Sequence, residues 1–292
     1  MEMQQLRYFV KLAELGSFTR AAEACFVSQP SLSQQIAKLE EEVGRPLFER
    51  LPRGAKLTDA GRLFEAHARN ILQLTDDALT KVADSPDAGR LAVGAIPTIA
   101  PFILPELLAK FAEECPKAEI AVIEAVTPEL LKLLNEGTVD VALLALPLAA
   151  PGLHVEKLFS EELLAVMPVN HPLAEKQRLR LEDLAAEPFV LLDDAHCLAG
   201  AALSFCRRHG HEPRSLARMQ QLATVQELVR LGRGVSLVPE MARALDVSPG
   251  RVYRSIAGDK PSRTVALAWN SHRFLTKLFK RFVALVRKEL AK

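Results

Sequence analysis

Hydrophobic residues recur at helical spacing through the first part of the chain. Apolar positions three and four apart between residues 6 and 15, and again between residues 32 and 39, predict helices there. Gly16 is suited to end the first helix, and Ser28 is suited to begin the later one, with a short Ala-rich helix between them. The basic stretch 45–58 surrounds a Pro-Arg-Gly turn and predicts a two-stranded wing. We therefore expect residues 1–57 to form a small helical domain with a wing.

A single long helix is predicted next, from about Asp59 to Val82, with Thr58 as its N-cap. Its apolar residues fall on one narrow face: Leu63, Phe64, Ile71, Leu74, Leu79 and Val82. Such a helix cannot bury its apolar face alone, so we expect residues 58–83 to be a linker that pairs with a second copy. The polar segment 84–90, which contains Pro and Gly, is the expected hinge.

From residue 91 to residue 292 short apolar strands alternate with amphipathic helices. The expected strands are 91–96, 120–124, 139–146, 163–169, 190–192, 236–238 and 265–269, and the expected helices are 102–114, 128–135, 224–230 and 274–290. Alternation of this kind predicts an α/β domain with a parallel sheet and right-handed crossovers.

Composition narrows the functional classes. A content of 49% hydrophobic and 25% charged residues is that of an ordinary globular protein. Pro147 and Pro151 interrupt the longest apolar run, so no membrane span is expected. The chain starts without a basic segment followed by an apolar one, which indicates a cytoplasmic protein. The reducing cytoplasm would keep its four cysteines (Cys25, Cys115, Cys197 and Cys206) from forming a structural disulfide framework.

A local sequence pattern, rather than the net charge of the chain, predicts nucleic-acid binding. Lys plus Arg is 37 and Asp plus Glu is 36, so net charge gives no support for it. A helix, a tight turn and a second helix with a polar first turn is the geometry that enters a major groove. The candidate DNA-binding residues are Ser28, Gln29, Pro30, Ser31, Ser33 and Gln34 on the second helix and Arg50 and Arg53 on the wing. On pattern alone, a helical head that only supports dimerisation remains open.

The stretch from Leu6 to Arg50 closely resembles the winged helix-turn-helix of LysR-type transcriptional regulators. The matching elements are Ala21-Ala22, Val27-Ser28-Gln29-Pro30-Ser31, Ser33, Ile36, Leu39-Glu40 and Gly44-Arg45-Pro46-Leu47-Phe48. The resemblance implies an N-terminal all-α winged helix-turn-helix, a long linker helix and a two-lobed α/β effector domain like a periplasmic binding protein. It also implies a homodimer or homotetramer that binds promoter DNA and contacts RNA polymerase, and that is not an enzyme.

A second segment, from Asp193 to Arg208, carries a His-Cys-Leu…Phe-Cys pattern that resembles the OxyR-type peroxide sensors of the same family. Residues 94–105, 124–131 and 231–239 also match that subgroup. The resemblance implies that Cys197 reacts with peroxide and Cys206 resolves the product, with Thr98, Thr127 and His196 in the peroxide pocket. One departure concerns an arginine that often follows the aromatic residue of the last strand in these proteins. Asn270 stands there, and Arg263 cannot be assumed to replace it.

The spacing of the two cysteines has a physical consequence of its own. Leu198–Cys206 is rich in Ala and Leu and predicts a helix. Nine helical positions separate the two Cα atoms by about 13 Å, whereas a disulfide needs about 4.4–6.8 Å. Forming a Cys197–Cys206 bond would therefore unwind the helix. Cys197 lies at the expected helix N-terminus, where free N–H groups favour a thiolate.

We therefore expect a regulator of oxidative-stress genes that senses hydrogen peroxide through a reversible Cys197–Cys206 switch, without metal or cofactor. A LysR-type regulator that binds a small organic acid between its lobes, through Thr98 and Thr127, is the alternative, and its cysteines would be structural. A cysteine peroxidase or another α/β enzyme with an appended head is a third hypothesis, and it predicts repeated turnover with a reductant.

Overall fold

A computed structural model describes residues 1–51, 54–82, 88–176, 178–193, 196–212 and 214–290. The chain divides into two compact units, Met1–Ala83 and Asp84–Lys292, each of which is described by itself. Arg53 and most of the expected hinge, residues 84–87, lie outside the described residues.

The first unit holds three short helices, a two-stranded wing and a long helix. Its elements are α1 (Met3–Leu15), α2 (Phe18–Ala24), α3 (Gln29–Val43), β1 (Phe48–Leu51), β2 (Gly54–Leu57) and α4 (Asp59–Val82). Gly16 and Gly44 adopt the left-handed conformation that ends α1 and α3. Phe9, which is fully buried, packs against the rings of Phe48 and Phe64 at centroid distances of 5.1 and 5.0 Å. One aromatic cluster thus joins α1, the wing and α4.

The wing is fixed to the third helix by a carboxylate. Glu40 accepts hydrogen bonds from the backbone N–H groups of Leu47 (2.7 Å) and Phe48 (3.0 Å). At the far end of β1, the guanidinium of Arg50 lies 5.2 Å from the ring centroid of Phe18. This cation–π contact holds a basic side chain of the wing beside the start of α2.

Helix α4 begins at the predicted N-cap. The Thr58 hydroxyl accepts a hydrogen bond from the backbone N–H of Gly61 at 2.9 Å. Leu63 and Leu74, both from the predicted apolar face, are 68% and 55% exposed in the single chain. The side chains of Leu79 and Val82 lie outside the described residues. A partner helix over this face therefore stays a prediction.

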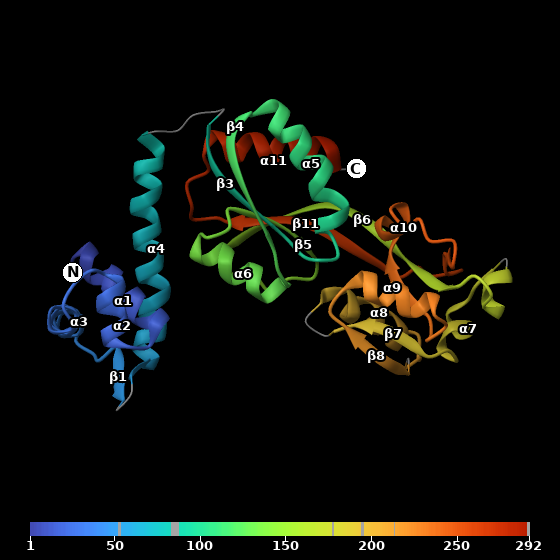
Figure 1. Ribbon diagram of the computed structural model, residues 1–292, viewed down its shortest axis with the longest axis horizontal. Coiled ribbons are helices and arrows are strands. Elements are labelled where there is room, and N and C mark those ends of the chain that lie inside the picture. The colour runs from blue at the N-terminus through green and yellow to red at the C-terminus, as the bar shows by residue number, and fades with distance from the viewer. Residues whose placement is uncertain (52–53, 83–87, 177, 194–195, 213, 291–292) are drawn as a thin grey trace. The chain divides into compact units, whose positions relative to one another are not determined.

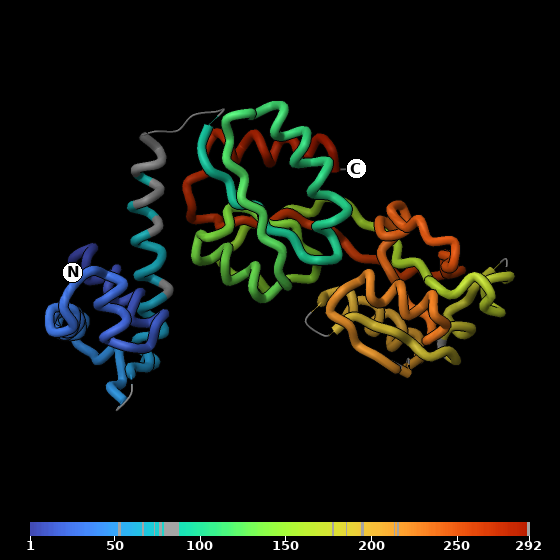
Figure 2. Tube along the Cα trace, viewed as in Figure 1, coloured from blue at the N-terminus to red at the C-terminus, as the bar shows by residue number. Residues whose placement is uncertain are grey.

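The second unit is an α/β domain with two hydrophobic cores (Figures 1 and 2). Its elements are β3 (Ala88–Ala95), α5 (Ala100–Glu114), β4 (Lys117–Glu124), α6 (Thr127–Glu136), β5 (Val141–Ala145), β6 (Leu153–Pro168), η1 (Pro172–Glu175), α7 (Leu181–Ala185), β7 (Phe189–Leu192), α8 (Cys197–Arg208), β8 (Ser215–Met219), α9 (Leu222–Arg230), β9 (Ser236–Pro239), α10 (Glu240–Ala244), β10 (Arg251–Arg254), β11 (Ser262–Asn270) and α11 (Lys277–Leu290).

We call the two halves of this domain lobe I and lobe II. In lobe I, α5 and α11 lie on one face of the sheet formed by β3, β4, β5 and β11, and α6 lies on the other (Figure 1). Lobe II contains β7 to β10 and α7 to α10. Strand β6 pairs with β11 in lobe I and then with β9 and β10 in lobe II, so it belongs to both.

The expectation of a parallel sheet is wrong for part of the domain. Strand β3 pairs in parallel with β4 and β5, as the alternating pattern predicted. Strand β11, however, is antiparallel to both β5 and β6. The chain leaves lobe I along β6 and comes back along β11, and two strands that lead out and back must run in opposite directions. This pair of strands is the connection between the lobes (Figure 2).

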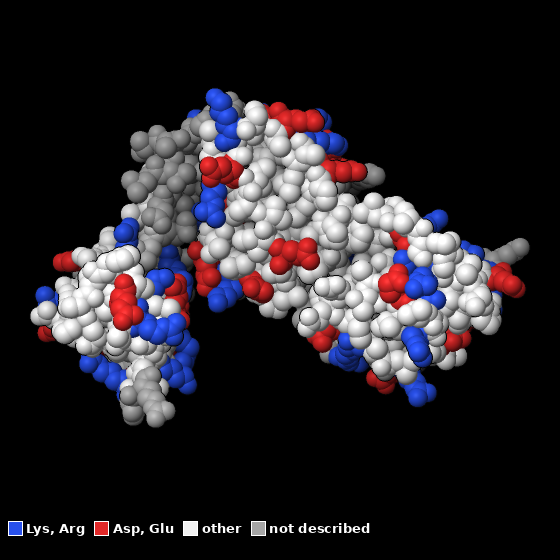
Figure 3. All heavy atoms as spheres, in the orientation of Figure 1, with Lys and Arg blue, Asp and Glu red and all other residues white. Residues whose placement is uncertain are grey.

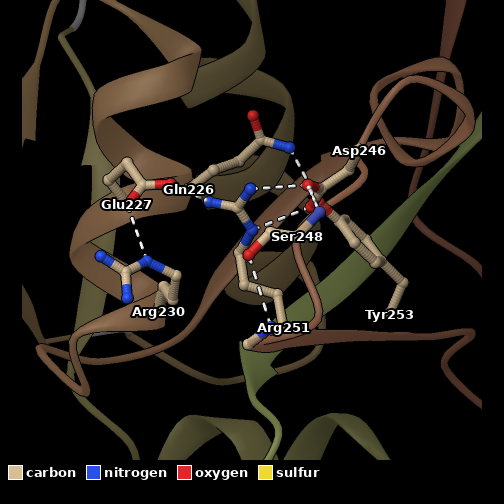
Figure 4. A network of polar contacts seen from close by, with 8 residues as sticks. Gln226, Glu227, Arg230, Asp246, Ser248, Arg251 and Tyr253 are labelled. Atoms are coloured by element: carbon tan, nitrogen blue, oxygen red, sulfur yellow. Dashed lines mark hydrogen bonds and ion pairs between the residues drawn. The ribbon is translucent and has the colours of Figure 1, made fainter.

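A buried polar network braces the outer part of lobe II (Figure 4). Arg251 donates to both carboxylate oxygens of Asp246, at 2.6 and 2.8 Å, and to Glu227 at 2.8 Å. The Tyr253 hydroxyl also donates to Asp246 and accepts from Gln226 at 2.8 Å. The carboxylate of Asp246 is 3% exposed, so these hydrogen bonds replace the hydrogen bonds to water that burial removes. Together they tie α9 to the loop before β10 and to β10 itself.

Candidate redox site and DNA-reading helix

Cys197 is the first residue of α8, as the sequence predicted, with His196 as its N-cap. The Cys197 side chain is half-buried and packs against the hydrophobic core of lobe I, although α8 otherwise belongs to lobe II. Its sulfur lies 2.8 Å from the hydroxyl oxygen of Thr127, the first residue of α6. Lobe I therefore supplies a hydroxyl that can donate to a thiolate on lobe II.

Next to this pair lies a buried arginine. Arg263 donates from Nη1 to the hydroxyl of Thr98 at 2.7 Å and from Nη2 to the Thr98 carbonyl at 2.8 Å. Its Nε donates to Glu161 at 2.8 Å, and its Nη2 lies 3.4 Å from the sulfur of Met241. The second oxygen of the Glu161 carboxylate accepts from the backbone N–H of Met241 at 3.0 Å. Arg263 and Glu161 are only 3% and 8% exposed.

Electrostatics connect this arginine to the cysteine. Burial lowers the pKa of the Arg263 guanidinium, while the negative charges of Glu161 and of an ionised Cys197 favour its charged form. A guanidinium remains protonated in proteins even when its pKa is lowered. The buried positive charge therefore attracts a thiolate at Cys197.

Arg263 is a site residue that the sequence analysis named but did not place in the site. It is the second residue of the last strand, seven positions before Asn270, within the segment Ser262-Arg263-Thr264-Val265. Asn270 lies at the other end of β11, where its side-chain oxygen accepts from the backbone N–H of His272 at 2.9 Å and holds a turn. An arginine at the head of an apolar strand is an unusual charge in a buried position, and that signal could have identified it.

Two of the three predicted pocket residues make contacts in the site, and the third only lies beside it. Thr98 and Thr127 are 2% and 9% exposed, and they contact Arg263 and Cys197 respectively. His196 is 7% exposed and precedes Cys197 directly. The hydrogen bonds of the described residues include none between the His196 ring and the Cys197 sulfur. The structure thus places His196 beside the site without showing it as a donor.

Cys206 has a different environment. It is 2% exposed, within the hydrophobic core of lobe II, and burial raises the pKa of its thiol. It lies nine positions after Cys197 in the same helix, which places the two Cα atoms about 13 Å apart. All four cysteines are free thiols in this structure. The structure is thus that of a state in which no disulfide joins the pair.

The DNA-reading candidates occupy the N-terminal turns of α3. The Ser28 hydroxyl is its N-cap and accepts from the backbone N–H of Ser31 at 3.3 Å. The exposed candidates are Ser28, Gln29, Pro30, Ser31 and Gln34, with Ser33 half-buried. Arg45, Arg50 and Lys56 are exposed on and before the wing. Figure 3 shows basic side chains gathered around that end of the unit, where phosphate contacts would be made.

Comparison with known protein families gives two matches. Residues 3–62 match the bacterial regulatory helix-turn-helix proteins of the lysR family, and residues 84–291 match the LysR substrate binding domain. Among curated proteins, the DNA-binding transcriptional dual regulator OxyR of Escherichia coli K12 is 35% identical over 295 residues, covering 98% of this chain and 95% of that protein.

Two solved structures extend the likeness. Full-length OxyR of Pseudomonas aeruginosa, carrying a cysteine-to-aspartate substitution, has a TM-score of 0.78 and 30% identity over 99% of this chain and 94% of that one. A peroxide-bound cysteine-to-serine mutant of Corynebacterium glutamicum OxyR has a TM-score of 0.66 and 35% identity over 98% and 92% of the two chains. Among the described residues, no helix is long and apolar enough to span a membrane.

Proposed function

Because the chain belongs to the LysR family of bacterial regulatory proteins, we propose that it is a DNA-binding transcription regulator that senses hydrogen peroxide through Cys197. We expect it to act in the cytoplasm as a homodimer or homotetramer on promoter DNA, with RNA polymerase as a further partner. Its relatives include the E. coli OxyR regulator and a peroxide-bound OxyR. The observation that carries the proposal is the 2.8 Å contact of the Cys197 sulfur with the Thr127 hydroxyl.

The first chemical step is an attack by the Cys197 thiolate on one oxygen of hydrogen peroxide. An S–O bond forms, the O–O bond breaks, and the departing hydroxide takes up a proton to become water. Cys197 is thereby oxidised to a sulfenic acid. The Thr127 hydroxyl contacts the sulfur, and Arg263 donates to the Thr98 hydroxyl and orients it. A hydroxyl in that position can donate to a peroxide oxygen.

The second step joins the two cysteines. The Cys206 sulfur attacks the sulfenic sulfur of Cys197, an S–S bond forms, and the oxygen leaves as water. One peroxide thus consumes two thiols and gives one disulfide and two waters. Because Cys206 starts inside the lobe II core, α8 must unwind and this core must repack before the bond can form. That change is the signal that subunit contacts would carry to the DNA-reading helices.

Two measurements test the proposal together. Free thiols are titrated before and after one equivalent of hydrogen peroxide, and footprints of the reduced and oxidised protein on promoter DNA are compared. We expect two thiols to be lost and the footprint to change. Stabilisation by a small organic acid, with no effect of peroxide, would instead identify a metabolite receptor. Continuous peroxide consumption with a reductant, at a rate useful for clearance, would identify a peroxidase.

A further inference from the structure

The turn between α2 and α3 has an unusual backbone. The N–H of Val27 donates to the carbonyl of Ala22 at 3.0 Å, and the N–H of Phe26 donates to that of Glu23 at 3.1 Å. These two hydrogen bonds are the pair that ends a helix when the first residue after its C-cap is in the left-handed conformation. Phe26 occupies that position, with φ +57°. Among the described residues, it is the non-glycine residue with a positive φ.

Other helices of the same chain end with a glycine in the left-handed conformation. Gly16, Gly44 and Gly137 close α1, α3 and α6 with φ values of 61°, 75° and 73°. Glycine has no Cβ and adopts this conformation without steric cost, whereas a bulky side chain does not. At α2 the chain instead places a phenylalanine. The local fold does not require this side chain, so its presence calls for another reason.

The ring of Phe26 does not pack inside the head. The residue is 96% exposed, whereas other aromatic residues of this unit, such as Phe9 and Phe48, are buried. Two residues later comes Ser28, the N-cap of α3, and then the exposed residues Gln29 and Ser31; Val27, between them and Phe26, is half-buried. The exposed aromatic ring therefore lies close in the chain to the candidate base-reading side chains.

We propose that Phe26 is a DNA-contact residue that packs its ring on the apolar surface of the duplex at the edge of each half-site. Two parts of DNA offer such a surface in reach of a turn that precedes a groove-reading helix: the C5-methyl of thymine and the deoxyribose face. Binding would cover the ring, and the strained turn sets the direction in which it leaves the backbone. The inference rests on the proposed DNA-binding function and adds an apolar anchor to the polar contacts of α3.

The test starts from duplexes selected out of a random-sequence pool by the reduced wild-type protein. Affinity for a selected duplex is then measured for wild type, for Phe26→Asn and for Val247→Asn. Asparagine tolerates the left-handed conformation, so the first variant keeps the turn and removes only the ring. Val247 is also 96% exposed but lies in the effector domain, which makes it the matched control. We expect Phe26→Asn to bind about tenfold more weakly, with an unchanged or higher melting temperature, and Val247→Asn to bind like wild type.

Replacing single thymines of the duplex by deoxyuridine locates the contact. If one replacement weakens wild type but leaves Phe26→Asn unaffected, the ring contacts that methyl group. If Phe26→Asn is weaker on every duplex, the ring packs on deoxyribose. Equal affinity of Phe26→Asn and wild type would overturn the inference while leaving DNA binding intact. A loss of self-association with unchanged DNA affinity would also overturn it, and failure of wild type to select any duplex would overturn the proposed function as well.

Discussion

The two ends of helix α8 hold the same chemical group in opposite surroundings. At its start, Cys197 is half-buried, contacts a hydroxyl of lobe I and lies near a buried guanidinium. At its other end, Cys206 is 2% exposed among apolar side chains of lobe II, and burial raises its thiol pKa. The difference assigns roles, because only a thiolate is a good nucleophile and burial disfavours the thiolate of Cys206. It also means that burial in the core of lobe II, and not only its distance from Cys197, keeps Cys206 from forming the disulfide in this fold.

The largest expected effect comes from removing either sulfur. Cys197→Ser should abolish thiol loss on addition of peroxide, because burial raises the thiol pKa of Cys206 and of Cys25, and Cys115 is buried. Cys206→Ala should instead lose a single thiol at the wild-type rate and stop at a sulfenic acid, which a dimedone-type reagent traps. Thiol titration and intact-mass measurement distinguish the two. Equal reactivity of both variants would remove the contrast between the two ends of α8.

Arg263 contributes to the environment of Cys197 and also to the stability of the fold. Arg263→Met leaves the Glu161 carboxylate buried without its partner, which should cost about 3–5 kcal/mol of unfolding free energy. The double variant Arg263→Met/Glu161→Met should recover much of that loss, since no buried charge remains. Denaturant unfolding measures both. A single variant as stable as wild type would show that the pair is less buried than its 1% and 6% side-chain exposure indicates.

A smaller effect is expected from removing only the Thr127 hydroxyl. Thr127→Val removes the group that lies 2.8 Å from the Cys197 sulfur while keeping the side-chain shape. We expect the rate of reaction with peroxide to fall about tenfold, the value of one charge-assisted hydrogen bond of about 1.4 kcal/mol. Stopped-flow measurement of peroxide consumption gives the rate. Ser160→Ala is the control, because Ser160 bonds Thr264 on the sheet surface and should leave the rate unchanged.

The network of Figure 4 should be insensitive to peroxide but sensitive to acid. Burial alone would raise the pKa of Asp246, yet the hydrogen bonds from Arg251 and Tyr253 outweigh it and lower that pKa below 3.8. Stability from this group is therefore fully present above about pH 4 and is lost as pH falls through the lowered pKa. Asp246→Asn should cost about 1–3 kcal/mol of unfolding free energy near neutral pH, and the difference from wild type should shrink as the pH falls through the lowered pKa. A constant difference at all pH values would contradict this assignment.

The ends of several helices could be predicted from the sequence, because the residue types at those positions determine them. Gly16, Ser28 and Thr58 act as the helix caps that their types predict, and α8 begins at Cys197. The direction of β11 could not be predicted, since it depends on a return path between lobes that no local pattern encodes. The apolar strand around Arg263 indicated its burial, but its place in the site could not be predicted, because that depends on residues far away in the chain. Its partners Thr98 and Glu161 are 165 and 102 positions away in the chain.

The central claim is that α8 cannot stay helical once its two sulfurs are joined. Hydrogen exchange of the backbone amides in residues 201–206, in the reduced protein and after one equivalent of peroxide, tests it most directly. We expect slow exchange in the reduced form and a large loss of protection once mass spectrometry shows the Cys197–Cys206 link. A linked protein with these amides still protected would contradict it.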